Sequence, residues 1–219
     1  MKSQKKILLE LLEVICKKMV ESEKILTELD SCIGDGDCGS GIKLGFQTVN
    51  EKLPTFTDQT MGNILKKVGM TLTATIGGTS GALFGTGFMR LGKLIGDKET
   101  VTTNDVVAAL KNALEGMKII GGETKVGDKT LIDALEPAIE ALSNSLIGGN
   151  DIVDAVEKAT EAALRGSDST INLIARKGRA SYLGERSIGH RDAGSMAIYL
   201  IFYVVNNYFK GGFYNEENN

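Results

Sequence analysis

The sequence has 219 residues, which suits one globular domain, because single hydrophobic cores stop growing only well above this length. Hydrophobic residues make up 42% and charged residues 24%, so the composition excludes disordered, collagen-like and membrane-spanning classes. The net charge of -3 argues against nucleic acid as the main partner. In so acidic a chain, any phosphate site should need metal ions or backbone amides to reverse the local sign of the potential.

The three cysteines, Cys16, Cys32 and Cys38, form no Cys-x-x-Cys pair, so they indicate neither a disulfide framework nor a closed zinc site. Acidic residues interrupt the first apolar segment, which is unlike a signal or transit peptide. The longest apolar run, 196–205, is far shorter than the ~20 residues that span a bilayer. We therefore expect a cytoplasmic protein with no membrane partner.

Helical periodicity dominates the first half of the chain. Apolar residues recur at helical spacing from Leu8 to Met19 and again from Ile25 to Leu29, which predicts one long helix or a bent pair. Residues 106–117 form another apolar face. Thr102 with Asp105 three residues later predicts a capping box at its start, and Gly121-Gly122 predicts its end.

The second half continues this pattern. Residues 131–146 predict a helix that Pro137 should kink or restart. A further helix is expected over 152–164, capped by Asn150 or Asp151. The apolar stretch 197–205 has an ambiguous period, and we interpret it as a buried C-terminal helix.

These elements predict an all-α, single-domain helical bundle or barrel with short, glycine-containing connections. We expect the domain to cover residues 1–210. The polar segment 211–219 follows a glycine pair and is expected to be a flexible tail.

A carboxylate-rich turn is the first candidate site. Asp30, Asp35 and Asp37 flank Gly34 and Gly36 at the end of the second apolar segment. The run Gly34–Gly39 formally fits a dinucleotide-binding fingerprint, but no strand precedes it. It also fails as a calcium-binding EF-hand loop, because Ser40 and Phe46 stand where that loop needs Gly and Glu. A Mg²⁺ site that bridges phosphates remains, and the alternative is an acidic loop that merely ends a helix.

Two further segments could contact phosphate. The run Gly77–Gly81 contains Thr79 and Ser80, whose hydroxyl groups could bind phosphate, although glycines at a helix crossing would look the same. The basic run 175–180 includes Lys177 and Arg179, which could offset phosphate charge or simply form a solvated helix end. We interpret His190, the only histidine, as structural rather than catalytic.

With these segments in view, the sequence closely resembles the family of ADP-binding L subunits of dihydroxyacetone kinase, the DAK2-domain family. The matching blocks are 34–37, 69–72, 77–81, 127–130 and 175–190. The resemblance runs from the first helix to about residue 209. It implies an eight-helix antiparallel barrel with the nucleotide at one end.

The resemblance also implies roles for individual residues. Asp30, Asp35 and Asp37 would coordinate two Mg²⁺ ions that bridge the phosphates of ADP or ATP. The residues implied in nucleotide binding are Cys38, Gly39, Ser40 and Gly41 in the phosphate-contacting turn, Thr79 and Ser80 in the glycine-rich loop, Gly122 and Leu131 at the adenine, and Arg179, Asp192, Ala193 and Gly194, which close the site.

In this family the ketose is held covalently on a histidine of a separate K subunit or domain, and the L part supplies the phosphoryl group. We therefore expect no catalytic residue in this chain, which acts by positioning and metal electrostatics. The expected partner is the substrate-binding K subunit. We also consider a homodimer.

The family uses two phosphoryl donors. In one mode ATP exchanges freely; in the other, bound ADP is rephosphorylated by a phosphohistidine-carrying protein of the phosphotransferase system. The size of the chain favours the second mode. However, Cys38 replaces the histidine often found at this position and looks more like the ATP-dependent enzymes.

Three other readings remain open at this stage. The ketose could be a tetrulose or another relative of dihydroxyacetone, because the sugar site lies outside this chain. The chain could instead be a non-catalytic helical adaptor. It could also serve another acceptor, as the fatty-acid kinase relatives do, but those carry the domain within a longer chain.

Overall fold

The computed structural model describes residues 3–211, which form helices and contain no strand. The α-helices and 3₁₀ helices (η) are α1 (Gln4–Glu21), α2 (Glu23–Ile33), α3 (Cys38–Lys52), η1 (Leu53–Phe56), α4 (Met61–Ile76), α5 (Gly78–Ile95), α6 (Thr103–Ile120), α7 (Ile132–Ile147), α8 (Ile152–Ser169), η2 (Thr170–Asn172), η3 (Arg179–Ser187) and α9 (Ala193–Phe209). The predicted all-α single domain is confirmed.

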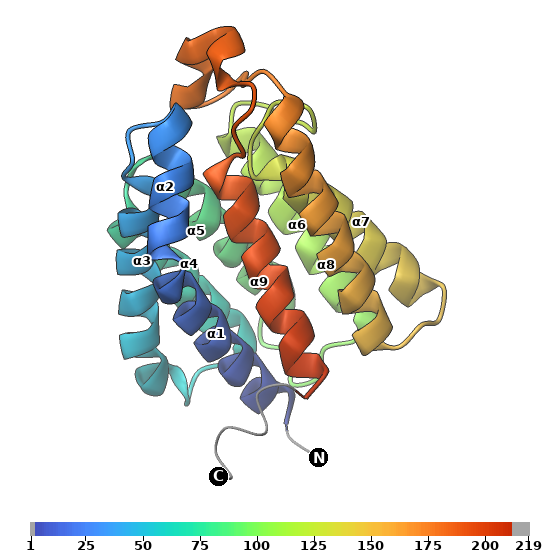
Figure 1. Ribbon diagram of the computed structural model, residues 1–219. Coiled ribbons are helices and arrows are strands. Elements are labelled where there is room, and N and C mark those ends of the chain that lie inside the picture. The colour runs from blue at the N-terminus through green and yellow to red at the C-terminus, as the bar shows by residue number, and fades with distance from the viewer. Residues whose placement is uncertain (1–2, 212–219) are drawn as a thin grey trace.

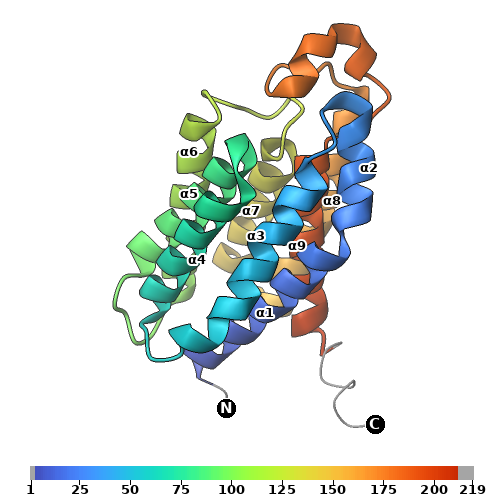
Figure 2. The same ribbon diagram turned by 90° about the vertical axis from the view of Figure 1, so that its left-hand side faces the viewer.

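The helices form a closed ring (Figures 1 and 2). From α3 to α9, each helix packs against the next one in the sequence, and α9 returns to pack against α1 and α2. Since α1 and α2 together fill one place, the ring within the described residues has eight positions. This arrangement agrees with the barrel that the resemblance implies.

The sequence predicted one long helix or a bent pair at the start of the chain, and the structure has the bent pair, α1 and α2. The bend lies at Ser22, whose hydroxyl donates a hydrogen bond of 2.7 Å to the carbonyl of Lys18. Apolar side chains of α1 at helical spacing, including Leu12, Ile15 and Met19, enter the main core. The bend carries α2 toward the end of the barrel at which Asp30 lies (Figure 1).

The predicted caps of α6 and α8 are confirmed. Thr102 accepts a hydrogen bond from the backbone N–H of Asp105, and the Asp105 carboxylate accepts one from the N–H of Thr102 at 2.9 Å. Gly121 ends α6. Asp151, rather than Asn150, caps α8 by accepting a hydrogen bond from the N–H of Asp154 at 2.9 Å. Each cap supplies an acceptor for a backbone N–H that the helix cannot satisfy internally.

Of the two effects predicted for Pro137, a kink or a restart, the restart is wrong, because α7 continues through the proline as one helix. Proline removes the hydrogen bond that the carbonyl of Asp133 would otherwise accept. That carbonyl lies against Gly166 of α8, so closely that a side-chain carbon at Gly166 would overlap it. The predicted C-terminal helix is confirmed as α9.

Alternating junctions place four loops at one end of the barrel. Because consecutive helices run up and down, the α2–α3, α4–α5, α6–α7 and α8–α9 junctions share the end that carries η3 (Figure 2). All the site residues expected from the sequence lie in or beside these four junctions. The fold thus collects segments that are up to about 160 residues apart in sequence.

Helices α4 and α5 cross at unusually close range. A side-chain carbon added at Gly69 of α4 would lie 2.6 Å from the carbonyl oxygen of Gly85 and 2.7 Å from the backbone nitrogen of Met89, both in α5. Backbone atoms cannot move aside as the end of a flexible side chain can. Gly69 is therefore required for this crossing, which fixes the α4–α5 junction.

None of the helices in residues 3–211 is long and apolar enough to cross a membrane. The tail expected over 211–219 lies outside the described residues from position 212 onward.

We predict that Gly69→Ala lowers the free energy of unfolding by about 1–3 kcal/mol, the usual cost of overpacking. A matched control is Gly81→Ala in α5, where an added carbon meets its nearest neighbours at 3.4 Å, an ordinary contact distance. This control should be neutral or stabilising by up to about 1 kcal/mol, because alanine favours helix more than glycine does. Chemical denaturation measures both, and equal stability of the two variants would contradict the close crossing.

Candidate functional site

Three carboxylates converge at the α2–α3 junction. Asp30, Asp35 and Asp37 each offer an oxygen atom, and these atoms all lie within 4.8 Å of one another. Asp30 is half-buried, and the other two are exposed. The geometry fits a hard cation such as Mg²⁺, which prefers a few carboxylate oxygens and leaves other coordination positions for water or phosphate.

Local packing creates this cluster. The N–H of Cys38, the first residue of α3, donates a hydrogen bond of 3.1 Å to the side chain of Asp30. Gly39 packs directly on α2, where a side chain would overlap the backbone of Glu23 and Thr27. The short link between α2 and α3 therefore has to fold tightly, and it carries Asp35 and Asp37 back toward Asp30.

The cluster is electrostatically unfavourable without a cation. The pKa of Asp37 is raised, first by loss of hydration and then by the negative charges of Asp35 and Asp30, although Arg179 opposes the shift. Like charges held this close favour protonation or a bound cation. A divalent ion would offset this repulsion.

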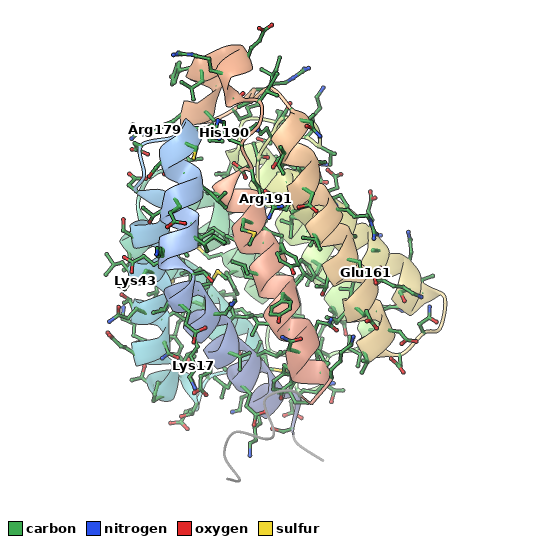
Figure 3. All side chains as sticks on the ribbon, viewed as in Figure 1. Lys17, Lys43, Glu161, Arg179, His190 and Arg191 are labelled. Carbon is green, nitrogen blue, oxygen red and sulfur yellow. The ribbon has the colours of Figure 1, made fainter. Side chains whose placement is uncertain are left out.

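One cation of the protein already reaches the cluster. A guanidinium nitrogen of Arg179, at the start of η3, lies 2.9 Å from a carboxylate oxygen of Asp35. Figure 3 shows Arg179 beside the end of α2. The structure thus joins the acidic turn to the basic segment 175–180, which the sequence separates by some 140 residues. The side chain of Arg179 is 70% exposed, so this ion pair by itself adds little stability.

Cys38 lies within the same turn as a neutral thiol. Burial and the charges of Asp30 and Asp192 raise its pKa to about 12. A thiol with so high a pKa is a poor nucleophile at neutral pH. Its position next to the carboxylates suits contact with a ligand rather than covalent catalysis.

The α4–α5 junction borders this turn through the backbone of Ile76. The carbonyl oxygen of Ile76 would lie 3.0 Å from a side-chain carbon placed on Gly41 of α3. Gly77 and Gly78 follow, both with positive φ, and nothing lies within 4 Å of the positions that their side chains would occupy. The start of α5, with Thr79 and Ser80, is therefore open to a ligand. No hydrogen bond links these two residues to the carboxylates in the described part of the chain.

The α6–α7 loop supplies Gly122 and Leu131. The carbonyl of Gly122 accepts a hydrogen bond of 2.5 Å from the Lys177 ammonium group, which connects this loop to the basic segment. Asp133, which is 1% exposed, accepts hydrogen bonds of 2.7 Å from the N–H groups of Gly127 and Thr130. The buried carboxylate thus fixes the loop that presents Leu131.

Asp192, at the start of α9, interacts electrostatically both with Asp133 of α7 and with Asp30 of the carboxylate cluster. It caps α9 by accepting a hydrogen bond of 2.6 Å from the N–H of Ser195. Burial raises its pKa to about 7, and the charges of Asp133 and Asp30 contribute in the same direction. Asp192 is therefore close enough to the carboxylate cluster to interact with it electrostatically. Gly194 packs against Leu131: a side-chain carbon added at Gly194 would lie 3.2 Å from the Cβ of Leu131.

The arrangement suits a phosphorylated ligand. Helices α3, α5 and α9 all begin at this end of the barrel. Helix N-termini present unpaired N–H groups and a partial positive charge, which favour anions. Carboxylates that could hold Mg²⁺ and helix ends that favour anions are thus adjacent.

The structure also qualifies several expectations. Gly39, Leu131 and Ala193 are buried, so they shape the walls of the site more than they expose side chains to it. His190 is half-buried, and its carbonyl accepts a hydrogen bond from the ammonium group of Lys129. Sequence reasoning did not single out Lys129 or Asp133, although Lys129 lies in the block 127–130 that carries the family resemblance.

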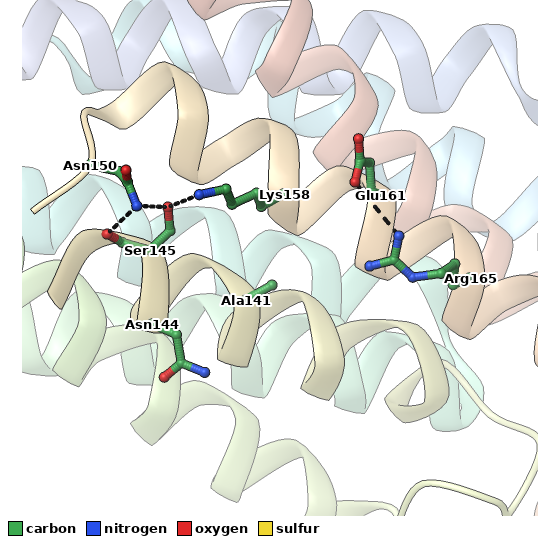
Figure 4. A pocket seen from close by; sticks show the side chains of 7 residues that line it. All are labelled: Ala141, Asn144, Ser145, Asn150, Lys158, Glu161 and Arg165. Carbon is green, nitrogen blue, oxygen red and sulfur yellow. Dashed lines mark hydrogen bonds and ion pairs between the residues drawn. The ribbon is translucent and has the colours of Figure 1, made fainter. Parts of the chain in front are cut away.

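Two cavities lie outside the carboxylate turn. One of about 420 Å³ lies on the flank of the barrel between α7 and α8, where its polar side chains largely contact one another (Figure 4). Another of about 280 Å³ lies between the end of α2, η2 and the segment that precedes α9. Its lining residues are Leu29, Cys32, Ile171, Gly189, His190 and Arg191. The carboxylate site is an open surface between junctions and coincides with neither cavity.

The chain is similar in sequence to proteins of known family. The profile of the DAK2 domain matches residues 32–207. The chain is 41% identical over 185 residues to the "PEP-dependent dihydroxyacetone kinase, ADP-binding subunit DhaL" of Escherichia coli, covering 84% of this chain and 87% of that one. It is 36% identical to the "PTS-dependent dihydroxyacetone kinase, ADP-binding subunit DhaL" of Lactococcus lactis, covering 85% and 88%.

A solved structure shares the fold. The dihydroxyacetone kinase from C. freundii in complex with AMP-PNP and Mg²⁺ superposes with a TM-score of 0.73 at 25% sequence identity. The match covers 95% of this chain but only 35% of the C. freundii chain. Taken together, the match of the domain profile, the full-length relatives and the shared barrel show that this chain belongs to the DAK2-domain family.

Proposed function

We propose that this chain is the nucleotide-binding subunit of a dihydroxyacetone kinase. It would transfer a phosphoryl group from Mg²⁺-bound nucleotide to dihydroxyacetone held on a separate K subunit. The observation that carries the proposal is the convergence of Asp30, Asp35 and Asp37 at the barrel end where three helices begin. The names of the E. coli and L. lactis relatives supply the substrate class.

The residues present fit the proposed cofactors. Asp30, Asp35 and Asp37 would hold two Mg²⁺ ions, which neutralise charge on the phosphates during transfer. The N–H groups at the start of α3 and α5 would bind phosphate oxygens, with Thr79 and Ser80 contributing hydroxyl groups. Gly122 and Leu131 would line the adenine pocket, as the family resemblance implies.

Arg179 would close the site over the phosphates, together with the start of α9 at Asp192, Ala193 and Gly194. In the structure, its guanidinium group already reaches Asp35, so it lies within range of any ligand bound between the carboxylates and η3. An arginine at this place can stabilise charge on a transferred phosphoryl group. The chain would thus act through positioning and electrostatics, without a nucleophile of its own.

We further propose that ADP stays bound and is rephosphorylated by a phosphohistidine-carrying protein of the phosphotransferase system. The names of the E. coli and L. lactis relatives, which describe PEP-dependent and PTS-dependent kinases, support this donor. The proposal places the domain at residues 1–210 and the protein in the cytoplasm, where its three free cysteines remain reduced.

A second candidate is an ATP-dependent ketose kinase subunit. Cys38 favours it, because the family resemblance implies that histidine is common at this place in the phosphohistidine-fed form. The chain is also 32% identical to the "L-erythrulose kinase" of Pectobacterium atrosepticum, although it covers only 31% of that protein. The two candidates differ in the phosphoryl donor and share the nucleotide site.

We predict that Asp35→Asn combined with Asp37→Asn abolishes Mg²⁺-dependent binding of ADP and ATP, because the metal loses two of its three carboxylate ligands. Isothermal titration calorimetry measures the binding, on protein from which any retained nucleotide has been removed. Asp58→Asn with Glu99→Gln is a control with the same change in charge at two exposed positions, and it should bind normally. An unmutated protein without nucleotide affinity in Mg²⁺ would rule out the proposed function and leave the adaptor alternative.

We also predict that Mg²⁺ alone raises the melting temperature of the unmutated protein, since it relieves the repulsion among the three carboxylates. The double variant should melt at the same temperature with and without Mg²⁺. Without metal it should be at least as stable as the unmutated protein, because two of the repelling charges are gone. Differential scanning calorimetry with and without a chelator tests both expectations, and a metal response in the double variant would contradict the assigned ligands.

The donor can be identified from the nucleotide that the protein retains. We predict that acid extraction of freshly purified protein releases ADP in nearly equimolar amount, and that added labelled ATP exchanges slowly with it. A protein that is purified empty and binds and releases ATP rapidly would instead support the ATP-dependent candidate.

A further inference from the structure

Lys129 is a charged residue in the interior of the protein. Its side chain is 1% exposed, and lysine is rarely buried to this extent unless it is paired. Its backbone has a φ of 61°, a left-handed conformation that is unfavourable for residues with a side chain. The lysine occupies this position at the expense of backbone strain, and its side chain makes contacts that glycine could not make.

The ammonium group of Lys129 joins three segments. It donates hydrogen bonds to the backbone carbonyls of Thr170, at the end of α8, and of His190, just before α9. Lys129 itself belongs to the α6–α7 loop. Hydrogen bonds from a charged donor are stronger than neutral ones, especially where water is excluded.

These three segments carry the adenine side of the proposed nucleotide site. Leu131 lies two residues after Lys129, and Asp192 lies two residues after His190. The hydroxyl of Thr170 accepts a hydrogen bond of 3.0 Å from the N–H of Asp192, so the segment after α8 is fixed to the segment before α9. The direct packing of Gly194 on Leu131 completes this wall.

The surrounding charges keep the ammonium group in place. Burial lowers the pKa of Lys129, while the carboxylates of Asp192 and Asp133 act in the opposite direction. Both carboxylates are fixed by backbone N–H groups of their own loops. The two carboxylates that favour the charged ammonium group therefore belong to the first turn of α7 and to the cap of α9, beside the segments that the cation joins.

We propose that Lys129 is a positioning residue that sets the distance between Leu131 and the segment 192–194, and thereby forms the pocket for the adenosine part of the nucleotide. This inference rests on the proposed function and adds a residue to it. Lys129 does not contact the phosphates, which bind at the α2–α3 and α4–α5 junctions. Its loss should weaken binding of the nucleoside part and leave the phosphate and metal site unchanged.

The test compares two ligands in Mg²⁺: ADP, which has both parts, and inorganic tripolyphosphate, which has only the phosphates. Lys129→Met removes the charge but keeps most of the side-chain volume. We expect it to lower ADP affinity by about tenfold or more, the effect of losing a charge-assisted contact. Tripolyphosphate affinity should change by less than about twofold, and Lys129→Arg should restore part of the ADP affinity.

Two further variants keep the test informative. Lys125→Met makes the same charge change at an exposed position of the same loop and should bind ADP normally. Lys129→Gly suits the left-handed backbone, so it should fold even where the methionine variant does not. It should show the same selective loss of ADP affinity.

The outcomes separate this inference from the proposed function. If the unmutated protein binds ADP and the folded Lys129 variants bind it equally well, the inference is wrong and the proposed function stands. Equal losses for ADP and tripolyphosphate would also overturn it, because they would indicate a general structural role. If the unmutated protein does not bind ADP in Mg²⁺, the proposed function fails, and the inference fails with it.

Discussion

Repulsion among Asp30, Asp35 and Asp37 is the constraint on which the rest of the site depends. Their oxygens lie within 4.8 Å of one another, a distance at which like charges oppose folding unless a cation intervenes. Two contacts hold the carboxylates together despite this repulsion: Gly39 packs tightly on α2, and the N–H of Cys38 donates a hydrogen bond to the carboxylate of Asp30. The protein offsets part of the charge with Arg179, which comes from the opposite end of the sequence. A carboxylate cluster maintained in this way has the geometry that the proposed function requires for divalent metal.

The up-and-down barrel explains why such a site can combine distant segments. Every second junction faces the same end, so four loops meet there although they are separated by entire helices. The packed helices fix the two ends of each loop. The close crossing of α4 and α5 at Gly69, for example, leaves these two helices little room to move relative to one another. Each loop can then contribute a different group: carboxylates, hydroxyls, an apolar wall or a guanidinium. The loops thus carry the candidate functional groups, and the packed helices fix the positions of the loops.

Much of the fold could be predicted from the sequence, because helical periodicity and caps are local signals. The capping box at Thr102 and the buried C-terminal helix follow from residues at most a few positions apart. Whether Pro137 ends a helix could not be read from the sequence: α7 continues through it, and the Asp133 carbonyl that loses its hydrogen bond packs against Gly166 of α8, a contact that no local pattern reveals. In the site, the carboxylates were recognisable by residue type and spacing. The ion pair between Arg179 and Asp35 and the buried contacts of Lys129 depend on chain topology, so they could not be inferred from neighbouring residues.

The return of α9 to the first helices has a consequence for synthesis of the protein. Helix α9 packs against α1, α2, α7 and α8, and Tyr208 near its end donates a hydrogen bond to Glu10 near the start of the chain. A ribosome releases the carboxylate turn well before the helix that closes the ring. A nascent chain must therefore keep its apolar helix faces from aggregating until α9 has been made. A site built from all four junctions is incomplete before α9 emerges, so a ligand bound there can stabilise only the closed barrel and not the intermediates that precede it.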